Sequence, residues 1–286
     1  YYIFIDEVQR IKKFEEAIAS VRVSFNCSLF VTGSNSKMLH GKMQDRLTGR
    51  AKEFEIYPFT YNETLEYKKV NNIKILENEF ENFIEYGGMP QRFEEVDENG
   101  IREYLLGLYY SIIDKDVYFV HKKISKKDFM NISKYIISTT GKTFSALSIA
   151  KYLKNSLPSD EQKKFSETVN NYAKYLEECY FIMECKPYYL KGKEALNGTK
   201  KYYAIDSGLR NALGNIIELD DTFALEGIIY NELLYRGYEV RYGKMIDGEI
   251  DFVAIKGKKK CLIQVAYSVD TEKAYNREYG AFDKIN

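Results

Sequence analysis

Tyr1–Glu7, which reads YYIFIDE, is the stretch that decides the fold. An apolar run that ends in two adjacent carboxylates is typical of a buried parallel strand with acidic side chains at its carboxyl end. Open α/β sheets place their ligand sites at that end of the strands. In a nucleotide hydrolase, Asp6 would hold Mg²⁺ and Glu7 would polarise the attacking water. The stretch therefore predicts a Walker B strand.

Two more strand patterns follow within the first 60 residues. Residues 8–23 have apolar side chains at a helical period, and Cys27–Val31 reads as a second buried strand. A second helix follows that strand, and residues 52–57 then alternate into a third strand. Strand, helix, strand, helix and strand at this spacing predict part of a parallel α/β sheet.

Polar and basic residues follow the second strand where a nucleotide hydrolase needs them. Ser34 or Asn35 can orient water against the terminal phosphate. Arg46 or Arg50, just before the third strand, can reach a phosphate bound by a neighbouring subunit, so an oligomer is possible. Acids at a strand end often only keep it soluble, and the acid pair alone favours that interpretation. The ordered set favours a nucleotide site.

The remaining chain divides into three parts with different patterns. Residues 61–138 are helical throughout and predict a helical lid or linker. Residues 139–210 contain two helices, of which Ser145 and Ser166 are the expected N-caps, and then two strands. This order predicts a winged helix-turn-helix. Residues 220–286 predict a small α/β domain that is truncated at its end. The expected fold class is therefore α/β plus α.

Composition excludes few classes of function. The 286 residues contain 42 Lys+Arg and 42 Asp+Glu, so the overall charge indicates no polyanionic or membrane partner. The four cysteines form no CxxC pair and the two histidines are isolated, so zinc-site spacing is missing. The chain has neither a signal-peptide pattern nor an apolar run near the roughly 20 residues of a membrane span. We therefore expect a cytoplasmic protein without a membrane partner.

The predicted winged helix has either DNA or a protein as its partner. Asn170 and Asn171 are the amides best placed to read bases, but Glu167, Glu177 and Glu178 outnumber the lysine on the same helix. Lysines in the loop and wing could contact phosphates: Lys163, Lys164, Lys191, Lys193, Lys200 and Lys201. DNA binding and protein docking both stay open.

The C-terminal part has the pattern of a degenerate metal site. Glu226 lies on a predicted helix, Glu249 and Asp251 on a strand, and Gln264 on the next strand. These residues resemble the core of PD-(D/E)xK nucleases, in which acids bind the metal and a lysine orients water. Gln264 stands in the place of the third acid, and Ala266 stands in the place of the lysine. We therefore expect a nuclease-like fold without cleavage.

Several motifs together closely resemble prokaryotic AAA+-type ATP-binding proteins that carry a C-terminal domain of unknown function 4143. They are Ile3–Gln9 (IFIDEVQ), Val31–Ser36 (VTGSNS), Leu47–Arg50 (LTGR), Phe54–Phe59 (FEIYPF), Tyr86–Pro90 (YGGMP), Asp114–Val117 (DKDV), Tyr203–Leu209 (YAIDSGL) and Gly248–Val253 (GEIDFV). The resemblance implies Asp6 as the Mg²⁺ ligand, Glu7 as the catalytic base, Ser34 or Asn35 as the sensor, and Arg46 or Arg50 as an arginine finger. Residues 1–60 would then be the C-terminal half of the nucleotide-binding core.

The sequence departs from this pattern at the phosphate-binding loop. A Gly-rich loop with a lysine is needed to cradle the phosphates, and none precedes Asp6. Thr140–Thr143 (TGKT) is no substitute, because the pattern requires glycine where Ile136 stands. We expect the chain to be a fragment without its Walker A loop, with a gapped or rearranged sheet. It should neither bind ATP tightly nor hydrolyse it.

Three functions follow in order of preference. The first is a full-length ATPase, with ATP and Mg²⁺ as cofactors, that switches C-terminal modules acting on nucleic acid or a protein. The second is a non-enzymatic DNA- or protein-binding module in which the nucleotide motifs are relics. The third is a metal-dependent nuclease, against which the missing lysine argues.

Overall fold

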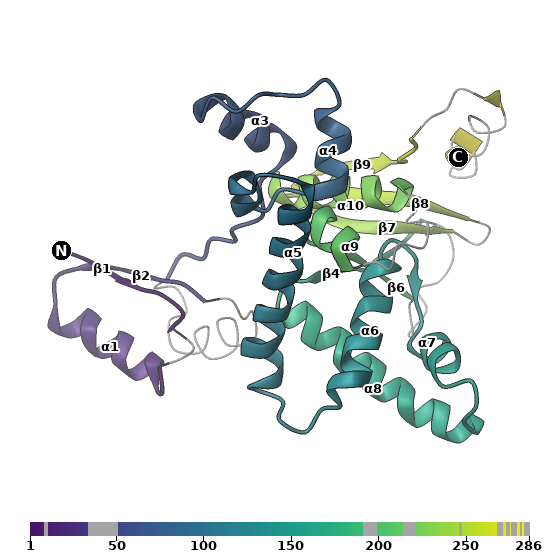
Figure 1. Ribbon diagram of the computed structural model, residues 1–286, viewed down its shortest axis with the longest axis horizontal. Coiled ribbons are helices and arrows are strands. Elements are labelled where there is room, and N and C mark those ends of the chain that lie inside the picture. Colours follow the sequence, from purple (N-terminus) through teal and green to yellow (C-terminus); the bar gives the residue numbers. More distant parts are fainter. Residues whose placement is uncertain are drawn as a thin grey trace.

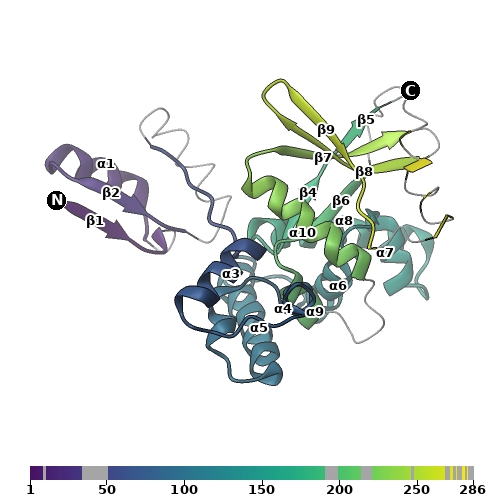
Figure 2. The ribbon, with the colours of Figure 1, turned by 90° about the horizontal axis from the view of Figure 1, so that it is seen from above.

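The computed structural model describes residues 1–8, 11–33, 51–190, 199–213, 221–245 and 248–267, together with residues 271, 272, 275, 279, 280 and 282. Within these residues the protein is a mixed α/β structure with a two-stranded, a three-stranded and a four-stranded sheet. The N-terminal sheet stands apart from the other helices and sheets, which pack together (Figure 1). Figure 2 shows the same separation from above. No helix in this part of the chain is long and apolar enough to cross a membrane.

The N-terminal unit is a parallel strand pair covered by one helix. Strands β1 (Tyr2–Ile5) and β2 (Ser28–Val31) pair in parallel, and α1 (Phe14–Ser24) connects them. The buried side chains of α1 pack against the inner positions of both strands. The opposite face carries Phe4 and Phe30, whose rings stack with centroids 5.1 Å apart and remain largely exposed. This face is thus an apolar surface without a cover among the described residues.

The predicted third strand is not formed. Residues 51–57 have no regular secondary structure, and Phe54 and Ile56 are 68% and 91% exposed. A parallel strand needs a hydrogen-bonded neighbour, and its apolar residues need cover on both faces. Among the described residues, the strands β1 and β2 pair only with each other. The backbone of residues 52–57 therefore has no neighbouring strand in this part of the chain with which to form hydrogen bonds.

The region predicted to be helical consists of helices throughout. In chain order they are α3 (Tyr61–Val70), α4 (Glu79–Tyr86), the 3₁₀ helix η2 (Pro90–Glu94), α5 (Glu98–Ile112), the π-helical turn η3 (Ile113–Tyr118) and α6 (Lys126–Ser138). Their starts follow capping chemistry. Thr60 and Glu63 form a capping box at α3, while the side chains of Asp97 and Ser125 accept backbone N–H bonds at α5 and α6.

A three-stranded antiparallel sheet follows α6. The elements are β3 (Thr143–Phe144), α7 (Ala146–Leu153), α8 (Ser159–Glu178), β4 (Ile182–Cys185) and β6 (Lys200–Ala204), and the strand order is β3-β6-β4. Ser145 caps α7 as predicted. The predicted cap at Ser166 is wrong, because α8 begins seven residues earlier, at Ser159 after Pro158, and the Ser166 hydroxyl donates to the carbonyl of Lys163 within the helix.

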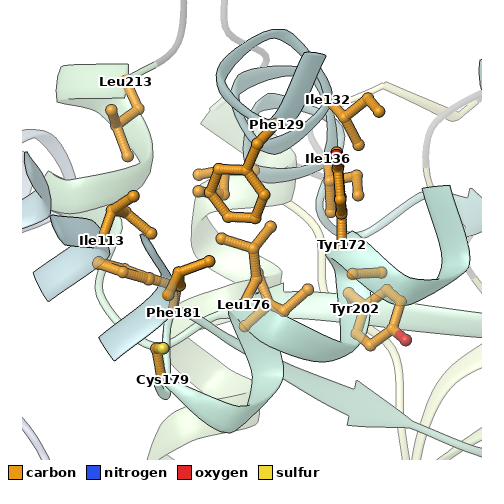
Figure 3. Close-up of a cluster of buried hydrophobic side chains, with 14 of the residues drawn as sticks. Ile113, Phe129, Ile132, Ile136, Tyr172, Leu176, Cys179, Phe181, Tyr202 and Leu213 are labelled. Carbon is orange, nitrogen blue, oxygen red and sulfur yellow. The ribbon is translucent and has the colours of Figure 1, made fainter. Parts of the chain in front are cut away.

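The main core lies between α5, α6, α8 and this sheet. Figure 3 shows Phe129 and Ile132 of α6 and Leu176 of α8 converging there, and all three are fully buried. The rings of Phe129 and Tyr172 meet edge to face with centroids 5.0 Å apart. These contacts hold α8 by one face, so the spacing of its apolar residues decides which side chains point outward.

The C-terminal sheet includes a strand from the middle of the chain. Its own elements are α10 (Asp221–Tyr235), β7 (Glu239–Met245), β8 (Gly248–Lys256) and β9 (Lys259–Ile263). The strand β5 (Pro187–Tyr189) joins them in the order β5-β7-β8-β9 and pairs with β7 in parallel. One of the two strands expected after the second helix covers residues 181–190 in the sequence pattern, and this prediction is wrong, since β4 and β5 belong to two different sheets. A short helix, α9 (Ser207–Leu213), lies between β6 and α10.

Candidate functional site

The acidic pair lies at the carboxyl end of β1, directly beside the end of β2. Because Ile5 pairs with Val31, the next residues, Asp6 and Thr32, are neighbours. The Thr32 hydroxyl donates a short hydrogen bond to Oδ1 of Asp6 and accepts one from the backbone N–H of Glu7 at 3.2 Å. One threonine therefore fixes the Asp6 carboxylate and the chain direction at Glu7.

The backbone at Glu7 adopts a conformation that is uncommon for a residue with a side chain. Its φ is +51°, in the left-handed region. The next residue, Val8, donates its N–H to the carbonyl of Thr32 at 3.0 Å and is fully buried. The chain thus turns sharply after β1 and keeps Asp6 exposed at the strand end. Non-glycine residues in this region cluster at functional sites.

The structure does not bring the whole predicted nucleotide site together. Asp6 and Glu7 are adjacent to Thr32, whereas the other predicted site residues, Ser34, Asn35, Arg46 and Arg50, lie outside the described residues. Sequence reasoning missed Thr32. The signal was present, because two parallel strands of equal length place the residues that follow them side by side.

A second cluster joins the three-stranded sheet to the C-terminal sheet. Lys201 on β6 has a side chain that is 4% exposed, and its Nζ lies 2.6 Å from Oε1 of Glu249 on β8. Burial alone would lower the pKa of Lys201, but the carboxylates of Glu249, Glu226 and Asp251 raise it overall. The ammonium group therefore stays charged. This contact corrects the prediction that Lys201 reaches phosphates, because the side chain points into the protein.

The buried carboxyls of this cluster have partners within the chain. The Tyr203 hydroxyl donates to Oε2 of Glu226 at 3.2 Å, and the N–H of Val265 donates to Oδ2 of Asp251 at 2.7 Å. The N–H of Asp251 donates to Oε1 of Gln264 at 3.3 Å. Burial, with the nearby Asp251 carboxylate, raises the pKa of Glu226 to about 7. The folded protein therefore favours the protonated form of this carboxyl more than water does.

Lys201 and Glu249 form an ion pair, and the nearby carboxyls of Glu226 and Asp251 accept hydrogen bonds from other groups of the chain. In the described part of the chain, no group of three or more His, Cys, Asp or Glu side chains is arranged to hold a metal ion. The predicted metal-site residues do share one neighbourhood, because Glu226, Glu249 and Asp251 all act electrostatically on Lys201. The sequence prediction missed Lys201 as their partner, since it comes from a strand about 50 positions earlier in the chain.

The motifs Tyr86–Pro90 and Tyr203–Leu209 meet at the buried carboxylate of Asp206. Asp206, directly before α9, is buried and accepts hydrogen bonds from the N–H groups of Gly88 at 2.7 Å and Leu209 at 2.9 Å. A Cβ on Gly88 would lie 2.0 Å from the carbonyl oxygen of Phe59, and one on Gly208 would lie 2.1 Å from that of Tyr86. These family-like motifs therefore form a structural junction, where only glycine permits the close backbone approach.

The structure buries part of the acidic charge that the sequence places on α8, while Asp160, Glu161 and Glu167 are exposed. Asn170, Asn171 and Lys174 are exposed. Glu178 is buried and Glu177 is half-buried, and burial raises the pKa of Glu177. Two of the three acids counted against DNA binding thus do not lie on the exposed face. Periodicity alone placed all three on one helix but did not distinguish its sides.

Comparison with known families agrees with the N-terminal geometry. Residues 1–65 match the family model of an AAA domain, which supports an AAA-type ATPase-like domain in the N-terminal part. Residues 77–220, half of the chain, match the family model described as a domain of unknown function (DUF8612). The chain belongs to this family. The matched domain differs from the domain of unknown function 4143 that the sequence motifs indicated.

Two proteins described as uncharacterized are similar to the chain over most of its length. An uncharacterized protein of Haemophilus influenzae is 31% identical over 269 residues, which are 94% of this chain and 66% of the relative. Uncharacterized protein MJ1544 of Methanocaldococcus jannaschii is 29% identical over 299 residues, covering 99% of this chain and 64% of the relative. The chain thus spans slightly less than two thirds of the length of these relatives. No solved structure matches it.

Proposed function

We propose that the protein is an ATP-dependent switch of the AAA type, whose remaining domains act on a partner. One observation carries the proposal: the Thr32 hydroxyl ties Asp6 to the backbone of Glu7 at the ends of two adjacent parallel strands. Open α/β sheets bind their ligands at this edge. The match of residues 1–65 to an AAA domain supports the same conclusion.

Asp6 would hold Mg²⁺ and Glu7 would activate water. The exposed carboxylate of Asp6 fits the ion, because Mg²⁺ is bound in proteins through one or two carboxylates and substrate phosphates. The bound ion would supply charge neutralisation on the nucleotide. Glu7 is half-buried one residue further on, where its carboxylate can accept a proton from water. By resemblance, Ser34 or Asn35 would serve as the sensor and Arg46 or Arg50 as an arginine finger.

The connection between the nucleotide domain and the rest supports a switching role. Phe59, just after the irregular residues 51–57, donates its N–H to the carbonyl of Gly88 at 2.9 Å. The N–H of Gly88 in turn donates to the buried Asp206 carboxylate at 2.7 Å. In our proposal, this junction is the point at which residues 1–65 contact α4 and α9.

The test measures nucleotide binding and turnover by the natural full-length protein. We expect Glu7→Gln to keep binding affinity within about twofold and to lower ATP turnover by about 100-fold or more, as for loss of a general base. Glu16→Gln is the matched control, because it removes the same charge from an exposed ion pair on α1. Turnover at the wild-type rate in Glu7→Gln, or an absence of nucleotide binding in the wild-type protein, would contradict the proposal.

A second candidate function is a binding module of the winged-helix type. The element order α7, α8, β4, β6 supports it, because two helices followed by two antiparallel strands are the order that a helix-turn-helix with a β-ribbon wing would have. In that case the nucleotide motifs would be relics, and the full-length protein would not turn over ATP. The nuclease alternative has less support, since the Lys201 ammonium lies among the carboxylates that a metal would need.

A further inference from the structure

A basic loop connects η3 to α6. Residues 117–127 contain four lysines and one histidine and no acidic residue. All four lysines are exposed: Lys122, Lys123, Lys126 and Lys127. Phe119 stands beside them with 73% of its surface exposed, and Nζ of Lys122 lies 5.8 Å from the centre of its ring. Because the chain carries equal numbers of acidic and basic residues, this concentration of charge is local.

The lysines occupy positions that helix electrostatics disfavours. Lys126 and Lys127 are the first two residues of α6, where the partial positive charge of the helix end repels cations. Asp128, the acid of that turn, has its carboxylate 3.0 Å from Nζ of Lys154. Within the described residues, none of the four loop lysines belongs to an ion pair. The charge of the four lysines is therefore not neutralised by an acidic side chain among the described residues.

Aromatic contacts fix the basic loop against α8. The ring of His121 stacks on that of Tyr175 with centroids 3.7 Å apart, and Tyr118 packs edge to face on Phe129. In Figure 1 the loop between α5 and α6 lies beside α8 at the lower edge of the molecule. Tyr175 is one turn from Asn171 on α8, and both Asn171 and Lys174 are exposed. The basic loop and the outer face of α8 thus form one surface.

We propose that this surface binds duplex DNA, with the four loop lysines on the phosphate backbone and the outer face of α8 toward a groove. The 20 residues of α8 span about 30 Å, enough to lie along the major groove. Asn171 and Asn170 supply amides that read base edges, which a lipid headgroup would not require. This inference deepens the partner-binding part of the proposed function and does not depend on ATP turnover.

The experiment measures binding of a fluorescent 20-base-pair duplex by anisotropy between 50 and 200 mM salt, with the natural full-length protein and no nucleotide. We compare the wild type with a variant in which Lys122, Lys123, Lys126 and Lys127 are all changed to Gln. The expected result is a loss of affinity of about tenfold or more, with the slope of log K against log salt reduced by about 1 per lysine removed. Changing the same four lysines to Arg should restore both affinity and slope.

The chain supplies a control with the same change in charge. Lys256, Lys258, Lys259 and Lys260 form an exposed run at the β8–β9 turn, and their replacement by Gln also removes four positive charges. We expect this variant to bind within about twofold of the wild type. If both variants lost the same affinity for the duplex, binding would depend on net charge alone, and the proposal would be overturned. So would an absence of duplex binding, or binding only to phosphatidylserine vesicles.

The outcome separates this inference from the ATPase proposal. Glu7-dependent ATP turnover without duplex binding would overturn the inference and leave the nucleotide proposal standing. Thermal melts of all variants check the fold, since exposed Lys→Gln changes should leave Tm unchanged. An Asn171→Asp variant adds a second readout on α8, and we expect it to weaken duplex binding because it places a negative charge toward the phosphates.

Discussion

At the scale of single residues, the motif Tyr86–Pro90 is explained by a close backbone contact and not by a role in catalysis or binding. The stretch Tyr86–Pro90 is one of the motifs that resemble ATP-binding proteins, yet Gly87 and Gly88 lie at the buried carboxylate of Asp206. Asp206 satisfies two backbone donors there and joins the end of α4 to the start of α9. Asp206 is thus a buried hydrogen-bond acceptor, and losing its backbone donors would lower the stability of the fold.

The first prediction concerns Gly88. We expect Gly88→Ala to lower the free energy of unfolding by about 3 kcal/mol, because the new Cβ would meet a backbone carbonyl that cannot move aside as a flexible side chain could. Gly107→Ala is the matched control, since nothing lies within 4 Å of a Cβ at that position on α5. It should be neutral or slightly stabilising. Urea denaturation of both variants measures the difference, and equal midpoints would refute the steric account.

The second prediction concerns Glu226 and pH. The pKa of this carboxyl rises from its ordinary 4.5 to about 7 in the folded protein, so the folded state favours the protonated form. Its contribution to stability is fully present below about pH 4.5 and is lost as the pH rises through about 7. Glu226→Gln should therefore stabilise the protein by about 2–3 kcal/mol at pH 8 and by little at pH 4.

Chemical denaturation across this pH range tests the prediction. Glu249→Gln is an informative comparison, because its carboxylate lies 2.6 Å from the buried Lys201 ammonium. That variant should be destabilised at pH 8, the opposite direction to Glu226→Gln. If the Glu226→Gln difference did not change with pH, the raised pKa would be wrong.

At the scale of elements, periodicity located the helices but not their ends. Ser145 caps α7 as predicted, whereas α8 extends seven residues further toward its N-terminus than expected. The sequence contained a competing signal, Pro158 followed by Asp160 and Glu161, which is typical of a helix start. The strand predicted at residues 52–57 failed for a different reason, since no neighbouring strand pairs with it.

The third prediction compares the two serines. Ser145→Ala should cost about 1 kcal/mol, because the side chain accepts the N–H of Ser148 at the start of α7. Ser166→Ala should change stability by less than about 0.5 kcal/mol, since its hydroxyl only donates to a carbonyl inside a formed helix. Thermal unfolding of both variants provides the measurement. Equal costs would mean that Ser166 also caps a helix.

At the scale of the whole molecule, one strand crossing joins the central and C-terminal parts. The N–H of Leu190 donates to the carbonyl of Lys244 at 3.0 Å, and that of Tyr242 donates to the carbonyl of Lys186 at 3.1 Å. The Tyr230 hydroxyl on α10 donates to the carbonyl of Glu184 at 3.1 Å. Together with the buried Lys201–Glu249 pair, these bonds tie the three-stranded sheet to the C-terminal sheet. The two sheets are therefore joined by backbone and side-chain bonds as well as by the chain itself.

The sequence by itself determined the parallel strand pair, the acidic residues at its end, the helical middle and the two helices α7 and α8 that follow it. These features depend on local patterns, since apolar period and capping residues act over a few positions. Tertiary structure alone decided that Thr32 holds Asp6, that Lys201 lies among Glu226, Glu249 and Asp251, and that β5 leaves its neighbour β4 for another sheet. The reason is that such contacts join residues far apart in the chain, and no local pattern specifies which partner a buried charge or an unpaired strand edge will find.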